Sequence, residues 1–125
     1  MRRPRIEFVI DCRDPGALVS FWETALAYTR HPEATEQPYQ GLLPPDDELG
    51  PVVVLQKVPE SKVVKNRAHL DLYVTDPGSL IEHLLRIGGS RLGEPQTYEG
   101  QWFQVMQDPE GNELCILKER GPELP

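Results

Sequence analysis

The pattern Asp-Pro-Gly-x-Leu occurs twice in this chain, first from Asp14 and again from Asp76, 62 positions later. Each copy follows a short segment of alternating apolar and polar residues, and each precedes apolar residues at helical spacing. Aspartate is a favoured N-cap and proline is favoured at the first helical position, so each copy indicates a strand, a turn and a helix. A repeat at almost half the chain length predicts two similar modules packed together, with a functional site between them.

The two predicted first strands, residues 5–13 and 66–75, each have an apolar face and a polar face. Successive side chains of a strand point to opposite sides, so the apolar face can pack on a helix while the polar face stays open. With the 62-residue offset, Glu7 and His69 occupy equivalent positions. The polar faces consist of Glu7, Val9, Asp11 and Arg13 in the first strand, and of His69, Asp71, Tyr73 and Thr75 in the second.

The remaining elements complete a βαβββ pattern in each half. The first helix begins at Pro15 and extends to about Ala27, with Trp22 on its apolar stripe. The second helix is expected to end at Gly88-Gly89, a pair suited to a left-handed C-terminal cap. We therefore predict an α+β fold of one domain, with module one at about 5–58, a linker at 59–65 and module two at about 66–118. Further strands are expected at residues 28–31, 39–43, 52–58, 91–96, 102–107 and 113–118.

Composition excludes several classes of function. The chain has 125 residues, a formal net charge of −7 and a pI of about 4.9, which disfavours binding to nucleic acid or to an anionic membrane surface. It has no long apolar run, so neither a signal peptide nor a transmembrane helix is expected. Two cysteines on opposite strand faces, Cys12 and Cys115, do not form a disulfide framework, so a reducing cytoplasm is the expected location.

Three motifs of the chain carry a family resemblance: Phe21-Trp22-x-x-Ala25-Leu26, Asn66-Arg67-Ala68-His69-Leu70-Asp71-Leu72 and Asp108-Pro109-Glu110-Gly111-Asn112-Glu113-Leu114. With them the chain resembles the vicinal oxygen chelate superfamily, which includes glyoxalase I, bleomycin-resistance proteins, extradiol dioxygenases and fosfomycin-resistance proteins. The resemblance covers about residues 5–118 and is strongest to the glyoxalase-like branch. It implies two tandem βαβββ modules whose sheets curl around a shared cleft, with the helices on the outer face. Family members are commonly homodimers, and the linker at 59–65 would permit exchange of modules between chains.

The resemblance also implies a divalent metal in the cleft. Each module would supply one ligand from its first strand and one from its last strand. The first-strand ligands would be Glu7 and His69, and the last-strand ligands would be Gln56 and Cys115. This set suits Zn²⁺ better than Mn²⁺ or Fe²⁺, and Ni²⁺ is a further candidate. Glu113, on the same strand face as Cys115, is the alternative carboxylate. Without a metal, His69 would be a hydrogen-bonded pocket residue and Cys115 a small half-buried one.

Two functions fit these residues. In the first, a metal polarises vicinal oxygens of a small substrate for lyase, isomerase or dioxygenase chemistry, with Glu113 or Asp71 as the general base. In the second, a metal-free protein of the bleomycin-resistance type sequesters a small organic molecule, and its cleft carboxylates favour a cationic ligand. The expected ligand contacts are Asp11, Gln56, Tyr73 and Trp102.

Overall fold

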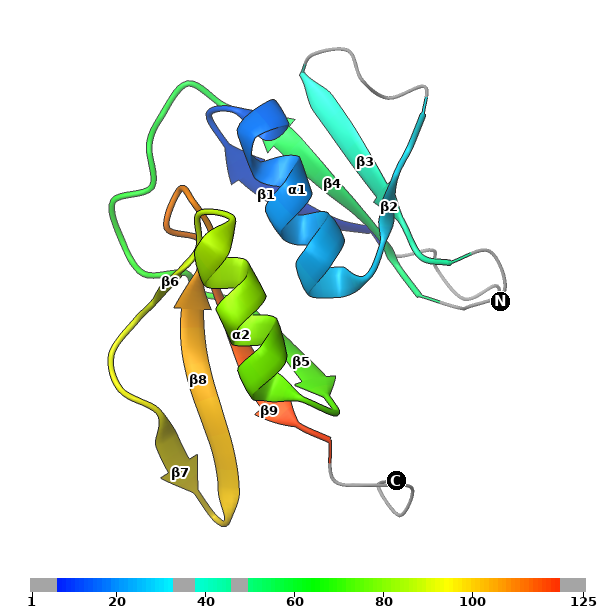
Figure 1. Cartoon of the computed structure of the whole chain (residues 1–125). Helices are drawn as coiled ribbons and strands as arrows, with labels where there is room; N and C mark the ends of the chain where they lie inside the picture. The colour runs from blue at the N-terminus through cyan, green and yellow to red at the C-terminus, as the bar shows by residue number, and fades with distance from the viewer. Residues whose placement is uncertain (1–6, 33–37, 46–49, 120–125) are drawn as a thin grey trace, which may run out of the picture. The chain divides into compact units, whose positions relative to one another are not determined.

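The computed structural model describes residues 7–32, 38–45 and 50–119 (Figure 1). The chain divides into two compact units between Val63 and Val64, inside the stretch predicted as a linker. Residues 5 and 6 of the predicted first strand lie outside the described residues. Together the units form a mixed α+β fold with two sheets and two helices. Among the described residues, no helix has the length and apolar character needed to cross a membrane.

The first unit is a four-stranded sheet with one helix against it (Figure 1). Its strand order is β1-β4-β3-β2, in which β1 runs parallel to β4 and the other pairs are antiparallel. Helix α1 contacts all of β2, β3 and β4, and the predicted core residue Trp22 is buried beside Phe21 in an edge-to-face ring contact. The elements are β1 (Glu7–Cys12), α1 (Pro15–Leu26), β2 (Thr29–Arg30), β3 (Tyr39–Leu43) and β4 (Val52–Lys57).

The second unit repeats this arrangement with one extra strand. Its order is β5-β9-β8-β6, with β7 also paired to β8, and β5 runs parallel to β9. Helix α2 contacts β9 and β6, so one face of the sheet is covered. The elements are β5 (Leu70–Val74), α2 (Pro77–Arg86), β6 (Ser90–Arg91), β7 (Gln96–Tyr98), β8 (Gln101–Gln107) and β9 (Glu113–Lys118).

Two predicted strands of the second unit need correction. The strand expected at 66–75 begins only at Leu70, and the strand expected at 91–96 is divided into β6 and β7. Gly93 has φ 75°, a left-handed conformation that interrupts a strand, and Pro95 cannot donate a ladder hydrogen bond. The second unit is therefore βαββββ instead of the expected βαβββ.

The repeated Asp-Pro-Gly pattern caps both helices in the same way. The side chain of Asp14 accepts a hydrogen bond from the Ala17 N–H at 3.2 Å, and that of Asp76 accepts one from the Ser79 N–H at 3.1 Å. The two aspartates also have nearly equal backbone angles, with φ −136° and ψ 88° in the first and φ −133° and ψ 81° in the second. Both predicted helix starts are thus confirmed.

The two helices end differently. At the end of α2, Gly88 has φ 104° and the Gly89 N–H donates to the Leu84 carbonyl at 2.8 Å, as expected for the Gly-Gly pair. At the end of α1, Ala27 takes the left-handed conformation with φ 55° and ψ 39°. An L-residue with a Cβ is strained there by about 1 kcal/mol, a cost that glycine avoids.

Replacing Ala27 with glycine is expected to raise the free energy of unfolding by about 0.5–1 kcal/mol, because relief of the left-handed strain exceeds the extra backbone entropy of glycine. Urea unfolding monitored by circular dichroism would measure the change. Ala27→Val is the matched control and should destabilise the protein, since a β-branched residue is least tolerant of positive φ. A glycine variant no more stable than wild type would contradict the expectation.

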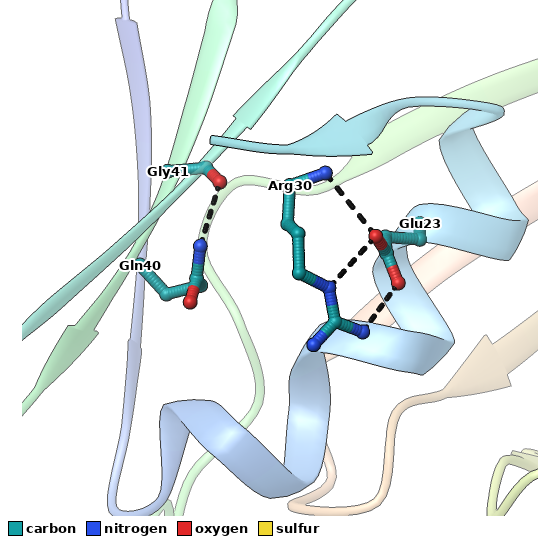
Figure 2. Close-up of polar contacts among 4 residues, drawn as sticks. All are labelled: Glu23, Arg30, Gln40 and Gly41. Carbon is teal, nitrogen blue, oxygen red and sulfur yellow. Dashed lines mark hydrogen bonds and ion pairs between the residues drawn. The ribbon is translucent and has the colours of Figure 1, made fainter. Parts of the chain in front are cut away.

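An ion pair holds β2 to the last turns of α1 (Figure 2). Arg30 donates from Nη2 to Glu23 Oε1 at 2.6 Å and from Nε to Oε2 at 2.9 Å, and its backbone N–H donates to Oε2 at 3.1 Å. These bonds lower the pKa of Glu23 and raise that of Arg30. Figure 2 also shows that Gln40, buried on β3, donates from Nε2 to the adjacent Gly41 carbonyl at 3.1 Å.

Candidate functional site

The second unit contains a pocket of about 570 Å³ on its sheet. Alternating positions of β8 and β9 supply much of its floor, and the β6–β7 connection and the segment before β5 supply parts of its wall. The apolar lining residues are Leu92, Tyr98, Phe103, Val105, Leu114 and Leu117. The polar ones are Lys65, His69, Asp71, Gln96, Gln101, Glu113 and Cys115.

Strand register brings three side chains of types that can ligate metals together at this pocket. Asp71 on β5 is the direct partner of Cys115 on β9, and His69 lies two residues before Asp71. Nε2 of His69 is 3.1 Å from Oδ1 of Asp71. One ligand atom from each of His69, Asp71 and Cys115 lies within 4.8 Å of the other two. Two predicted metal ligands and one predicted general base thus form a single cluster.

Cys115 is held as a neutral thiol by its surroundings. It is half-buried, and this loss of solvation raises its pKa to about 11, assisted by the charge of Asp71 and by a hydrogen bond to that carboxylate. Lys65 opposes the shift and Glu113 adds to it. A reactive thiolate would need further positive charge beside it, since burial, Asp71 and Glu113 together outweigh the effect of Lys65 on the pKa.

Glu113, the other predicted general base, is buried, with 7 % exposure. Its Oε2 accepts the backbone N–H of Asn66 at 3.4 Å, and its Oε1 is 3.8 Å from Nζ of Lys65. The Asn66 side chain in turn donates to the Glu113 carbonyl at 3.3 Å. Glu113 therefore ties the segment before β5 to the start of β9, and this segment contributes Lys65 to the pocket wall.

The turn before β9 positions Glu113 and Cys115. Asp108 is almost fully buried, with 2 % exposure, and its Oδ1 accepts the N–H groups of Glu110 and Asn112 at 2.8 and 2.9 Å. Its Oδ2 accepts Nδ2 of Asn112 at 2.9 Å. Gly111 has φ 88°, which this turn requires. The Asp-Pro-Glu-Gly-Asn motif thus forms a hydrogen-bonded turn that fixes the start of β9.

The aromatic lining of the pocket comes from Phe103 and Tyr98. Trp102, which we expected to contact a ligand, is adjacent to Phe103 on β8 and is absent from the described pocket lining. Tyr73 is half exposed on β5 and is also absent from this lining. The alternation of Gln101, Phe103 and Val105 along β8 was the sequence signal that identifies the pocket face.

Comparison with known proteins identifies the family. A sequence model of the glyoxalase-like domain matches residues 7–117, almost the whole chain. The chain belongs to the glyoxalase-like domain family. This places it in the vicinal oxygen chelate superfamily, as its motifs predicted. No curated protein is significantly similar to this glyoxalase-like chain in sequence.

Solved structures share the glyoxalase-like fold at low sequence identity. A glyoxalase/bleomycin resistance protein/dioxygenase family enzyme from Burkholderia phytofirmans PsJN matches with a TM-score of 0.71 and 18 % identity, over 90 % of this chain and 95 % of that chain. The fosfomycin resistance protein FosX from Mesorhizobium loti matches with a TM-score of 0.70 and 13 % identity, over 98 % and 96 %. Hypothetical protein SA1046 from S. aureus matches at 0.68 and 17 %, over 92 % and 96 %. At these identities the likeness concerns the fold.

Among the described residues of its first unit, this glyoxalase-like chain does not repeat the donor cluster. The sequence alignment placed Gln56 opposite Cys115. In the second unit Cys115 pairs with Asp71, whose counterpart in the first unit is Val9. Val9 pairs with Val54, whereas Gln56 pairs with Asp11. By strand register the counterpart of Cys115 is therefore Val54, two residues before Gln56; paired positions of the first and last strands lie 45 residues apart in the first unit and 44 in the second. Glu7 is exposed on β1 opposite Val52. Its role as a metal ligand stays a prediction, as do the ligand contacts of Asp11 and Gln56.

Proposed function

We propose that the pocket of the second unit binds a small organic molecule with an apolar body and a polar group at one end. The register of β9 supports this division. Cys115 pairs with Asp71 on β5 and with Val105 on β8. Leu117, two residues further along β9, pairs with Phe103 on β8. Phe103 in turn pairs with Gln96. The pocket thus has a polar end at the cluster and an aromatic end towards β7, an arrangement common in small-molecule sites. This polarity of the lining is the observation that carries the proposal.

The charges at the polar end favour a cationic group when no metal is bound. Asp71 and Glu113 both line the pocket, with Lys65 as the one lysine among its lining residues. Phe103 and Tyr98 offer ring surfaces to a ligand body. This is the binding or sequestration function expected of a protein of the bleomycin-resistance type, and it requires no reaction.

A second candidate function is supported by the donor cluster itself. Imidazole nitrogen, carboxylate oxygen and thiol sulfur within 4.8 Å are suitable ligands for a divalent ion of the zinc type, so the residues present fit the metal that the family implies. Such an ion would supply Lewis-acid polarisation of vicinal oxygens in lyase or isomerase chemistry. His69, Asp71 and Cys115 would hold it, and the apolar part of the pocket would orient the substrate and exclude water.

We also retain the finer expectations of the family resemblance as part of this proposal. The two sheets would curl around a shared cleft with the helices outside, and the protein would act as a cytoplasmic homodimer. The dimer rests on the family resemblance, since members of this superfamily are commonly homodimers. Sedimentation velocity of the full chain would test the oligomeric state.

Binding to the pocket can be tested with probes of similar size and different charge. Phenethylamine, 2-phenylethanol and phenylacetate would be titrated into ¹⁵N-labelled protein, with chemical-shift changes followed on β8 and β9. We expect the amine to bind most tightly and to shift amides near Phe103 and Cys115. Absence of shifts for all three probes at millimolar concentration would contradict the proposed pocket function for this ligand class.

Matched variants make this test specific. Val105 lies in the pocket floor, so Val105→Phe should fill the space and abolish the amine-induced shifts. Thr97→Phe adds similar bulk at an exposed position on β7 outside the described lining and should leave binding within about twofold of wild type. Equal losses in both variants would indicate a general effect of added bulk and would contradict the assignment.

A further inference from the structure

We infer that Gln104, a buried residue outside the pocket, positions the part of the pocket wall that Leu92 forms. Gln104 lies on β8 between Phe103 and Val105, which both line the pocket. Successive side chains of a strand point to opposite faces, so the Gln104 side chain lies on the other face, where it is 1 % exposed. The predicted effect on ligand binding rests on the proposed function, whereas the positioning itself is independent of any ligand.

The outer edge of the second sheet has a bulge between β6 and β7, formed by residues 92–95 (the edge bulge). Strand β6 ends where Arg91 pairs with Met106, and β7 begins where Gln96 pairs with Phe103. Four residues of the edge therefore lie opposite only two residues of β8. The excess interrupts the ladder, as in a β-bulge, so the backbone groups of the edge bulge need other partners.

The edge bulge is held to β8 by its own backbone and by the Gln104 side chain. The Leu92 N–H donates to the Val105 carbonyl at 2.9 Å. Nε2 of Gln104 donates to the Gly93 carbonyl at 3.1 Å and to the Val105 carbonyl at 2.9 Å. The Gln104 amide thus takes the place of a missing ladder bond directly beside Leu92. Because Leu92 lines the pocket, the way in which the edge bulge is held determines where this wall residue lies.

The Gln104 amide does not serve the stability of the core. Its Oε1 is buried and has no hydrogen-bond partner among the described residues, an arrangement that disfavours folding. Gln104→Met keeps the length of the side chain and removes this acceptor, and the carbonyl of the exposed Gly93 can bond to water instead. The substitution should therefore leave the global free energy of unfolding unchanged or raise it slightly. A local effect on the edge bulge can then be separated from an effect on the whole fold.

Amide hydrogen exchange tests the positioning without a ligand. Gln104→Met should reduce the protection of the Leu92 N–H about fivefold relative to amides of the β8–β9 ladder, since one net hydrogen bond across the edge bulge is lost. Ile116→Val is the matched control, because Ile116 is buried and pairs with Gln104 from β9, on the side of β8 away from the bulge. It should leave the relative protection of Leu92 unchanged. Unchanged protection in Gln104→Met, or an equal loss in both variants, would overturn the inference.

Gly93→Ala loosens the edge bulge by a second route and keeps the test informative if the methionine variant does not fold. An added Cβ would meet no atom within 4 Å, but the left-handed φ of 75° is strained for alanine. Opening of the bulge relieves this strain, so Leu92 protection should again fall about fivefold. Protection that falls in Gly93→Ala but not in Gln104→Met would show that the bulge does not depend on the Gln104 amide.

The effect on binding is tested with phenethylamine and the larger 2-(2-naphthyl)ethylamine. In the wild type the second ring should improve affinity about fivefold, because it buries more apolar surface against the wall at Leu92. This gain should fall below about twofold in Leu92→Ala and in Gln104→Met, and the double variant should lose no more, since Gln104 acts through Leu92. Additive losses would contradict the positioning role. If neither amine binds the wild type, the proposed function fails, and hydrogen exchange alone decides whether Gln104 positions the wall.

Discussion

Replacing Asp108 with alanine is expected to lower the free energy of unfolding by about 3 kcal/mol, because three hydrogen bonds to a buried carboxylate are lost together. The bonds come from the N–H groups of Glu110 and Asn112 and from the Asn112 side chain, at 2.8–2.9 Å. Asp108 is 2 % exposed, so water cannot simply replace the carboxylate. Thermal unfolding should show a fall in Tm of about 10 °C.

Two further variants control the Asp108 result. Asp108→Asn keeps an oxygen for the two backbone N–H groups but places an amide donor against Nδ2 of Asn112, so it should lose about 1–2 kcal/mol. Glu82→Ala, an exposed carboxylate on α2, should change stability by less than about 0.5 kcal/mol. If Asp108→Ala were no more destabilised than Glu82→Ala, the turn would not depend on this carboxylate.

Cys115 of the metal-free protein is expected to react with iodoacetamide about tenfold more slowly at pH 8 than it does in the urea-unfolded chain. Its pKa is raised to about 11, first by loss of solvation and then by Asp71. This lowers the thiolate fraction about 100-fold relative to an ordinary cysteine, and the greater nucleophilicity of a more basic thiolate recovers about tenfold. Mass spectrometry of the alkylated peptide, in a Cys12→Ser background, would give the rate.

The pH dependence and one substitution test the cause of this slow reaction. Because the pKa is raised, the folded protein keeps its thiol proton where an unfolded chain has begun to lose it, so the rate should keep rising up to about pH 11. Asp71→Asn removes the second cause but leaves the first, so the rate at pH 8 should increase several-fold without reaching the unfolded value. A rate that levels off near pH 8.5 would contradict the raised pKa.

The donor cluster of this glyoxalase-like chain differs in residue type from the metal set implied by its superfamily. The family position at Cys115 carries a thiol where a carboxylate is expected, and the structure places the carboxylate of Asp71 directly beside it. The proposed pocket and the proposed ion site share this end of the second unit.

Local features of the sequence predicted much of the fold correctly. Asp14 and Asp76 identified both helix starts, because an aspartate cap and a following proline act within a few residues of the chain. Alternation placed His69 and Asp71 at one face of β5, because side-chain direction in a strand depends only on position parity, but on β8 the expected contact was Trp102 and the pocket is lined by its neighbour Phe103. The strand at 91–96 was wrong because the left-handed Gly93 and the proline after it outweigh the propensity of their neighbours.

The sequence by itself determined most of the elements, both helix starts, the family and the types of donor available on each strand. Only the tertiary structure decided that Asp71 meets Cys115, that Glu113 is buried against Asn66, and that Val54 and not Gln56 corresponds to Cys115. The physical reason is that these facts depend on strand register, which is set by pairing between residues more than 40 positions apart. Periodicity within one strand specifies a face, whereas the partner across the ladder is specified by the packing of the whole sheet.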